Sequence, residues 1–215
     1  MQVISVNVGM PREVVWRGAT VQTAIFKEPV SGRVSVDTLN LAGDKQADLT
    51  VHGGAHKAVY AYPHEHYEYW RKELAADLSP GNFGENFTIT GLAENALFIG
   101  DRLRVGSAVL TVTQPRMPCY KLGIRFQRDD IIKLFLASRR SGFYFSVEQE
   151  GEVAAGATME FLSRDPERVT VTDIVDLYVA KAPDAALLER ALRVDALPAN
   201  WKSVLAARAE AKLAH

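Results

Sequence analysis

The sequence predicts a mainly β fold with some α structure, in which a strand-rich domain over residues 1–163 precedes a small three-helix domain over residues 164–215. Two observations predict it. Many short segments of apolar and β-branched residues are punctuated by Gly, Pro and Asn before residue 164, which is typical of a barrel or a sandwich. Beyond Arg164 the period changes to that of short amphipathic helices.

The predicted strands begin at the N-terminus. The segment MQVISVNVG alternates apolar and polar residues and ends on Gly9. Residues 101–114, DRLRVGSAVLTVTQ, have the pattern of two strands around a Gly-Ser turn, and Pro115 ends the second. The remaining predicted strands lie within residues 19–26, 32–41, 85–92, 142–151 and 157–164.

Two helices are predicted inside the strand-rich region. The first covers residues 63–78, with Pro63 in its first turn. The second lies within residues 128–140, and Gly142 follows its end. One face of the first helix is apolar and consists of Tyr67, Trp70, Leu74 and Leu78.

Three amphipathic helices are predicted after Arg164, and they are separated by Pro183 and Pro198. The first begins at a pair that resembles a capping box, Thr170 and Asp173. Residues 164–215 contain eight Lys/Arg and eight Asp/Glu, whereas a DNA-binding helix-turn-helix module should be clearly basic. The tail is therefore predicted to be a docking module that does not bind nucleic acid.

The whole-chain composition excludes several classes of protein. Apolar residues make up 47% of the 215 residues, charged residues 24%, and the net charge is −1, so no overall field attracts nucleic acid or a membrane. A single cysteine cannot form an intramolecular disulfide. No apolar run approaches the length of a membrane-spanning helix, and the N-terminus lacks the pattern of a signal peptide. We expect a cytoplasmic protein without a membrane partner.

The single cysteine, Cys119, lies in the segment QPRMPCYKLG. It has three interpretations, as a buried packing residue, a nucleophile or a metal ligand. From Arg102 to Arg128 there are six Lys/Arg and no Asp or Glu, and such surroundings favour the thiolate. Pro115 and Pro118 stiffen the loop, which suits a functional side chain.

Four of the five histidines lie between His52 and His66. A zinc site made only of these is disfavoured, because Gly53 and Gly54 interrupt the helix that an i, i+4 pair would need. The glycine pair followed by Lys57 is typical either of an ordinary turn or of a backbone nest for a phosphate or other oxyanion. A hydrolase that pairs Cys119 with one of these histidines also stays open.

Other motifs add constraints. The loop GNFGENF, residues 81–87, can be turn chemistry or can present amides to a ligand. There is no G-x-G-x-x-G after a strand, no P-loop and no C-x-x-C pair, so dinucleotide binding and iron–sulfur ligation by this chain are unsupported.

Six motifs follow one another along the chain: IFKEPVSG, LAGDKQADLTVHGGAHKAVYAY, HYEYW, GNFGENFT, IGDRLRVG and QPRMPCYKLGIRF. This ordered set resembles the MOSC-domain family, in its YiiM-like group. The resemblance covers roughly residues 1–163, and the tail resembles the small three-helix domain that often follows in this group. One departure is Ser146, which stands where the family often has arginine.

The resemblance implies a MOSC β-barrel-like domain that binds the molybdenum cofactor, an anionic pterin with a dithiolene and a phosphate. Carried over by motif, Cys119 would be the protein ligand to molybdenum, and Cys119, Asn86 and His52 would be the catalytic residues. The residues that would bind the cofactor are Lys27, His52, Lys57, Asn86, Arg116 and Lys121.

The activity that the resemblance implies is reduction of N-hydroxylated compounds, such as N-hydroxylated purine bases. A separate reductase would supply electrons, and a histidine, Asp48 or a water chain would supply protons. A carrier of the cofactor or its sulfur without turnover is the alternative, and a homodimer stays open.

Overall fold

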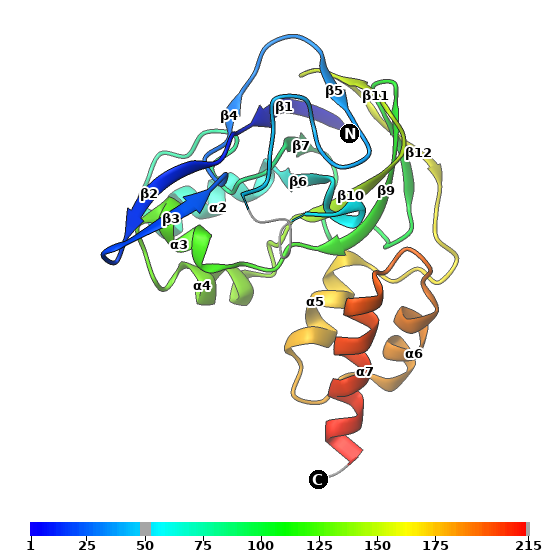
Figure 1. Cartoon of the computed structure of the whole chain (residues 1–215). Coiled ribbons are helices and arrows are strands. Elements are labelled where there is room, and N and C mark those ends of the chain that lie inside the picture. The colour runs from blue at the N-terminus through cyan, green and yellow to red at the C-terminus, as the bar shows by residue number, and fades with distance from the viewer. Residues whose placement is uncertain (48–52, 214–215) are drawn as a thin grey trace.

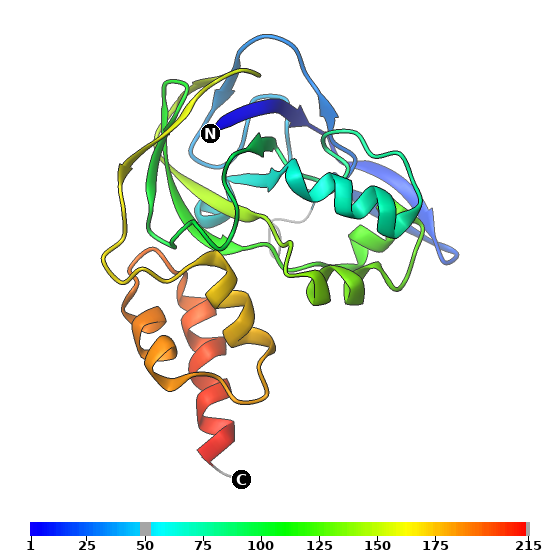
Figure 2. The same cartoon turned by 180° about the vertical axis from the view of Figure 1, so that it is seen from behind.

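A large mixed sheet and a group of C-terminal helices make up the molecule (Figures 1 and 2). The computed structural model describes residues 1–47 and 53–213. Eight strands form the large sheet in the order β12-β8-β9-β10-β6-β7-β1-β4. They are β1 (Gln2–Val8), β4 (Glu28–Pro29), β6 (Val59–Pro63), β7 (Phe87–Thr90), β8 (Arg102–Val105), β9 (Ala108–Pro115), β10 (Phe143–Gln149) and β12 (Met159–Ser163).

The sheet is curved but not closed into a barrel. Neighbouring strands pair antiparallel except β6 and β7, which run parallel. The edges are β12 and β4, yet an isolated bridge joins Gln2 to Thr158, just before β12. Close by, the Val3 N–H donates to the Ala157 carbonyl at 2.9 Å. The fold class predicted from the sequence is therefore confirmed, with the barrel incomplete.

Two smaller two-stranded sheets flank the large one. The hairpin of β2 (Arg12–Trp16) and β3 (Ala19–Thr23) projects from the body, as Figure 1 shows. Strands β5 (Val34–Val36) and β11 (Gly151–Val153) pair antiparallel. Neither β2 nor β11 was among the predicted strands as an element of its own.

Helix α2 (Glu65–Leu74) is shorter than the predicted helix. Pro63 ends strand β6 instead of opening the helix, so this part of the prediction was wrong. The reason is burial: all five residues of β6 are buried, and Val59 faces one core whereas Tyr60 faces another. A fully buried strand has no polar alternation for the sequence to show.

Three further short helical segments lie within the described strand-rich part of the chain. Helix α4 (Ile131–Ser138) lies within the predicted segment, and α3 (Tyr120–Phe126) and the 3-10 turn η1 (Ala55–Lys57) were not predicted. Aromatic and aliphatic side chains of β6, α2, α3, α4 and the loops beside them form a second core. It consists of Ile25, Tyr60, Tyr62, Tyr67, Trp70, Leu78, Phe83, Leu122, Ile131 and Phe135.

The predicted C-terminal helices are α5 (Val171–Val179), α6 (Ala185–Arg193) and α7 (Ala199–Leu213). The Thr170 and Asp173 capping box is present in full. Apolar residues of these helices, such as Ile174 and Trp201, belong to the same core as the large sheet, so the helices pack on the sheet directly. Within the described ranges, no helix has the length and apolar character needed to cross a membrane.

Candidate functional site

A pocket brings together six of the seven residues that the sequence nominated as a site. Its wall includes Lys27, Lys57, Asn86, Arg116, Cys119 and Lys121. These residues come from four separate stretches of the chain, so the tertiary fold alone gathers them. The seventh, His52, and the suggested proton source Asp48 lie outside the described residues.

Lys27 forms a buried ion pair with Asp44. The Lys27 and Asp44 side chains are 9% and 1% exposed. Burial lowers the pKa of Lys27, and the neighbouring Asp44 carboxylate opposes that shift. Asp44 was not singled out from the sequence, because one acid in a loop gives no periodic signal. Since its charge is balanced inside the protein, Lys27 has less charge to offer a ligand than the resemblance implied.

Asn86 lines the pocket, but protein groups already use its amide. Its Oδ1 accepts from the Tyr60 N–H at 3.1 Å. Its Nδ2 donates to Asp44 Oδ2 at 2.9 Å and to the Asn7 carbonyl at 3.4 Å. This geometry favours a positioning role for Asn86, which holds Asp44 and the edge of β6 in place.

Glu85, the neighbour of Asn86, organises the GNFGENF loop. Its carboxylate accepts from the Gly81 N–H at 2.9 Å, the Phe83 N–H at 3.1 Å and the Thr88 hydroxyl at 2.8 Å, and also from the Tyr67 hydroxyl. Burial raises the pKa of Glu85, and these hydrogen bonds oppose the rise. The loop is therefore shaped by a buried carboxylate that the sequence analysis did not nominate.

Arg116 forms the inner wall of the pocket. It is 6% exposed, and its Cζ lies 5.1 Å from the centre of the Phe135 ring and 5.5 Å from that of Tyr60. Its Nη1 is buried without a hydrogen-bond partner among the described residues. A buried guanidinium N–H without a partner is costly, and an anionic ligand in the pocket would satisfy it.

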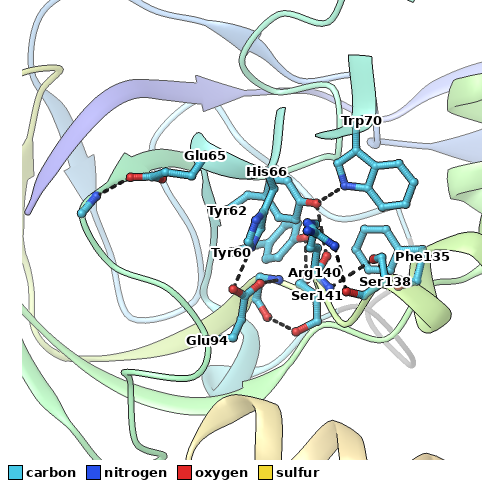
Figure 3. A network of polar contacts seen from close by, with 12 residues as sticks. Tyr60, Tyr62, Glu65, His66, Trp70, Glu94, Phe135, Ser138, Arg140 and Ser141 are labelled. Atoms are coloured by element: carbon cyan, nitrogen blue, oxygen red, sulfur yellow. Dashed lines mark hydrogen bonds and ion pairs between the residues drawn. The ribbon is translucent and has the colours of Figure 1, made fainter. Parts of the chain in front are cut away.

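A network of polar contacts supports the aromatic wall behind Arg116 (Figure 3). The Tyr60 hydroxyl donates to the Ser141 carbonyl at 2.9 Å, and the Gly142 N–H donates to Glu94 Oε1 at 2.7 Å. His66 Nε2 lies 2.8 Å from the other Glu94 oxygen. The Arg116 N–H in turn donates to the Gly142 carbonyl at 3.4 Å. The network therefore fixes the backbone at Gly142, to which the Arg116 N–H is hydrogen-bonded.

Cys119 is partly exposed and lies at the N-cap of α3, with an extended backbone. The thiol is therefore not a fully buried packing residue. Lys57 interacts with it electrostatically, and burial lowers the pKa of Lys57 while Cys119 raises it. The Arg116 guanidinium also interacts with Cys119. The expected cationic surroundings of the thiol are therefore present, although Lys57 comes from another part of the chain.

The HGG segment leads into the turn that carries Lys57. Gly54 has φ 98° and caps η1, and its carbonyl accepts from the Lys57 N–H at 2.9 Å. Of the clustered histidines, His66 pairs with Glu94. In the described part of the chain, no three His, Cys, Asp or Glu side chains gather as a protein-ligated zinc site would require. Ser146 is not part of the pocket wall.

The charges of the pocket fit an anionic cofactor. Over its described wall, five cations face one carboxylate, Asp44. The cations are Lys27, Lys45, Lys57, Arg116 and Lys121. This excess suits a group that carries a phosphate and a thiophilic metal, as do the single thiol and the Arg116 Nη1, which no described residue hydrogen-bonds.

Comparison with known proteins gives two family matches. The MOSC domain matches residues 48–160, and the YiiM-like 3-alpha helix domain matches residues 169–210. The Bacillus subtilis protein YflK is 39% identical over 201 residues, which are 94% of this chain and 91% of that protein. Protein YiiM of Escherichia coli is 36% identical over 86% of this chain and 84% of its own.

Two further similar proteins are a solved crystal structure and a protein whose name describes an activity. The crystal structure of YiiM from Geobacillus stearothermophilus superposes with a TM-score of 0.81 at 33% identity, over 97% of this chain and 98% of that one. A Gibberella moniliformis protein named reductase is 31% identical over 80% of this chain. The matched segment is only 31% of that longer protein.

Proposed function

This chain belongs to the MOSC-domain family, with the YiiM-like three-helix domain after it, and on that premise we propose that it is a molybdenum-cofactor-dependent reductase of N-hydroxylated compounds. The observation that carries the proposal is the pocket itself. It combines one thiol, an excess of cations and a buried Arg116 Nη1 that has no hydrogen-bond partner in the described part of the chain.

Cys119, Arg116, Lys57 and Lys121 would hold the cofactor. Cys119 would be the ligand to the metal, and the three cations would bind the anionic pterin part. Lys27 and Asn86 would act indirectly, because their polar groups already bond to Asp44. When bound, the cofactor supplies the two-electron redox chemistry, and the protein supplies position and charge.

The overall reaction balances as a two-electron reduction. R–NH–OH takes up two electrons and two protons, the N–O bond breaks, and R–NH2 and water leave. Lys57 lies beside Cys119, and burial lowers its pKa, so its Nζ is an acid suited to proton delivery at the leaving oxygen. The sequence carries no nucleotide or iron–sulfur motif, so a separate reductase would donate the electrons.

Metal and pterin content tests the proposal directly. The chain would be produced in a host that makes the cofactor, and molybdenum per chain would be measured for wild type, Cys119→Ala and the remote variant Lys72→Ala. We expect near-stoichiometric molybdenum and turnover of N-hydroxylated aminopurine, with a chemical electron donor, for wild type and Lys72→Ala. The Cys119→Ala variant should lose turnover.

Two results would contradict the proposal. Wild-type protein without molybdenum or pterin would remove its basis, as would full activity of Cys119→Ala. Full loading without turnover of any N-hydroxylated compound would instead support the alternative, a carrier of the cofactor.

A further inference from the structure

A second cavity lies between the Cys119 loop and the C-terminal helices. It encloses about 300 Å³ and adjoins the cation-rich pocket. Four residues line both of them: Lys57, Met117, Cys119 and Tyr144. The Cys119 thiol therefore lies at the boundary between the cation-rich pocket and the second cavity.

The cation-rich pocket and the second cavity differ in chemistry. Over the described residues, Lys57 is the one charged side chain that lines the second cavity. Apart from the Cys119 thiol, its walls are otherwise aromatic, apolar or amide groups, with Tyr144 on the sheet side and Tyr178, Trp201 and Val204 on the helices. An anionic cofactor suits the cation-rich pocket, and a flat uncharged ring suits the second cavity.

Trp201 is held in one orientation before any ligand binds. Its Nε1 donates to Gln114 Oε1 at 2.7 Å. Its ring meets that of Tyr178 edge to face at 5.6 Å between centroids, and the residue is only 6% exposed. An aromatic wall that is already ordered loses little side-chain entropy when a ring packs against it.

The same contact ties the helical domain to the turn that carries Lys57. The Gln114 side chain that accepts from Trp201 also donates from Nε2 to the His56 carbonyl at 3.0 Å. The Thr113 hydroxyl donates to that carbonyl at 2.7 Å. Gln114 therefore links Trp201 to the turn that contains Lys57.

We propose that this second cavity is the substrate subsite and that it takes one flat, uncharged N-hydroxylated heteroaromatic base. The inference rests on the proposed function and deepens it. The base lies against Tyr178 and Trp201, and its N–OH group points to Cys119 and Lys57. A volume at the small end of the range for ligand pockets, about 300–1,000 Å³, suits a base better than a nucleotide. The C-terminal helices then determine specificity.

A substitution at Val204 can test the proposed subsite without disturbing the hydrophobic core. It lines the cavity and is 41% exposed, so Val204→Trp should fill the cavity without removing core packing. Ser203→Trp is the matched control, because Ser203 is exposed on the same helix and does not line the cavity. Binding of 6-N-hydroxylaminopurine to cofactor-free protein would be measured by calorimetry, and molybdenum content and KM would be measured on loaded protein.

We expect Val204→Trp to weaken binding of the base and to raise KM by about 5- to 150-fold, the range that loss of one stacking interaction gives. Molybdenum content should stay at the wild-type level, and Ser203→Trp should match wild type throughout. Equal binding by Val204→Trp and wild type would overturn the inference. Loss of molybdenum from Val204→Trp would also overturn it, since the cavity would then belong to the cofactor.

The two proposals fail in distinguishable ways. Base binding to cofactor-free wild type, abolished by Val204→Trp, would support the subsite even if loaded protein showed no turnover. Turnover that is unaffected by Val204→Trp would leave the proposed function standing and would refute the subsite.

Discussion

The buried pair of Lys27 and Asp44 gives the sharpest prediction for stability. Asp44→Ala removes a carboxylate that is 1% exposed and accepts from Lys27 Nζ, from Asn86 Nδ2 at 2.9 Å and from the Gly9 N–H at 2.8 Å. The buried ammonium of Lys27 is then left without its counter-ion. Removing one partner of such a pair costs about 3–5 kcal/mol, which is roughly 6–20 °C in Tm for a chain of this size.

Urea unfolding measures this loss, with Lys27→Met and the double variant completing a cycle. We expect Lys27→Met to be destabilising as well, and the double variant to be far more stable than the sum of the two single losses predicts. Asp77→Ala is the control, because Asp77 is fully exposed and lies 3.9 Å from its cation; it should change stability by no more than about 0.5 kcal/mol. A loss below about 1 kcal/mol for Asp44→Ala, or additivity in the cycle, would refute the reasoning.

Three further predictions concern the pocket and its support. Burial raises the pKa of the folded-state Glu85 carboxyl above 4.5, so the folded state holds this proton more tightly than the unfolded chain does. The resulting contribution to the free energy of unfolding is complete below pH 4.5 and is lost as the pH rises through the raised pKa. Glu85→Gln, although less stable overall, should lack this decrease when the free energy of unfolding is measured against pH. The same decrease in the variant as in wild type would contradict the assignment to Glu85. Gly142→Ala forces a Cβ to within 2.5 Å of the Ala61 carbonyl oxygen at φ 62° and should cost about 2–5 kcal/mol in thermal unfolding, whereas Gly18→Ala, at φ 79° in open space, should cost about 1 kcal/mol. Lys57→Met should weaken retention of the cofactor about ten- to 100-fold, measured as molybdenum left after dialysis, and equal retention by this variant and wild type would argue against a direct contact.

The sequence by itself determined the fold class and the local elements with clear periodicity. The sequence of strand β1 alternates apolar and polar residues from Ile4 to Val8, and the Thr170 and Asp173 pair marks the start of α5, so both could be predicted. Strand β6 could not, because it is buried on both faces and carries no alternation. Helix α3 was missed because Pro115 and Pro118, in the segment before it, indicate a loop.

The candidate site was likewise predicted from the sequence in part, and the rest became visible only in the tertiary structure. Residue types and ordered motifs nominated Cys119, Arg116 and Lys57, because a thiol among cations is a chemical signal that a sequence displays. Only the tertiary structure decided that Asp44 balances Lys27 and that Asn86 acts through its neighbours. It also decided that Trp201, 82 residues after Cys119 in the chain, lines a cavity beside the thiol. Pairing of buried charges and the packing of one domain on another depend on distances through space, which linear spacing does not encode.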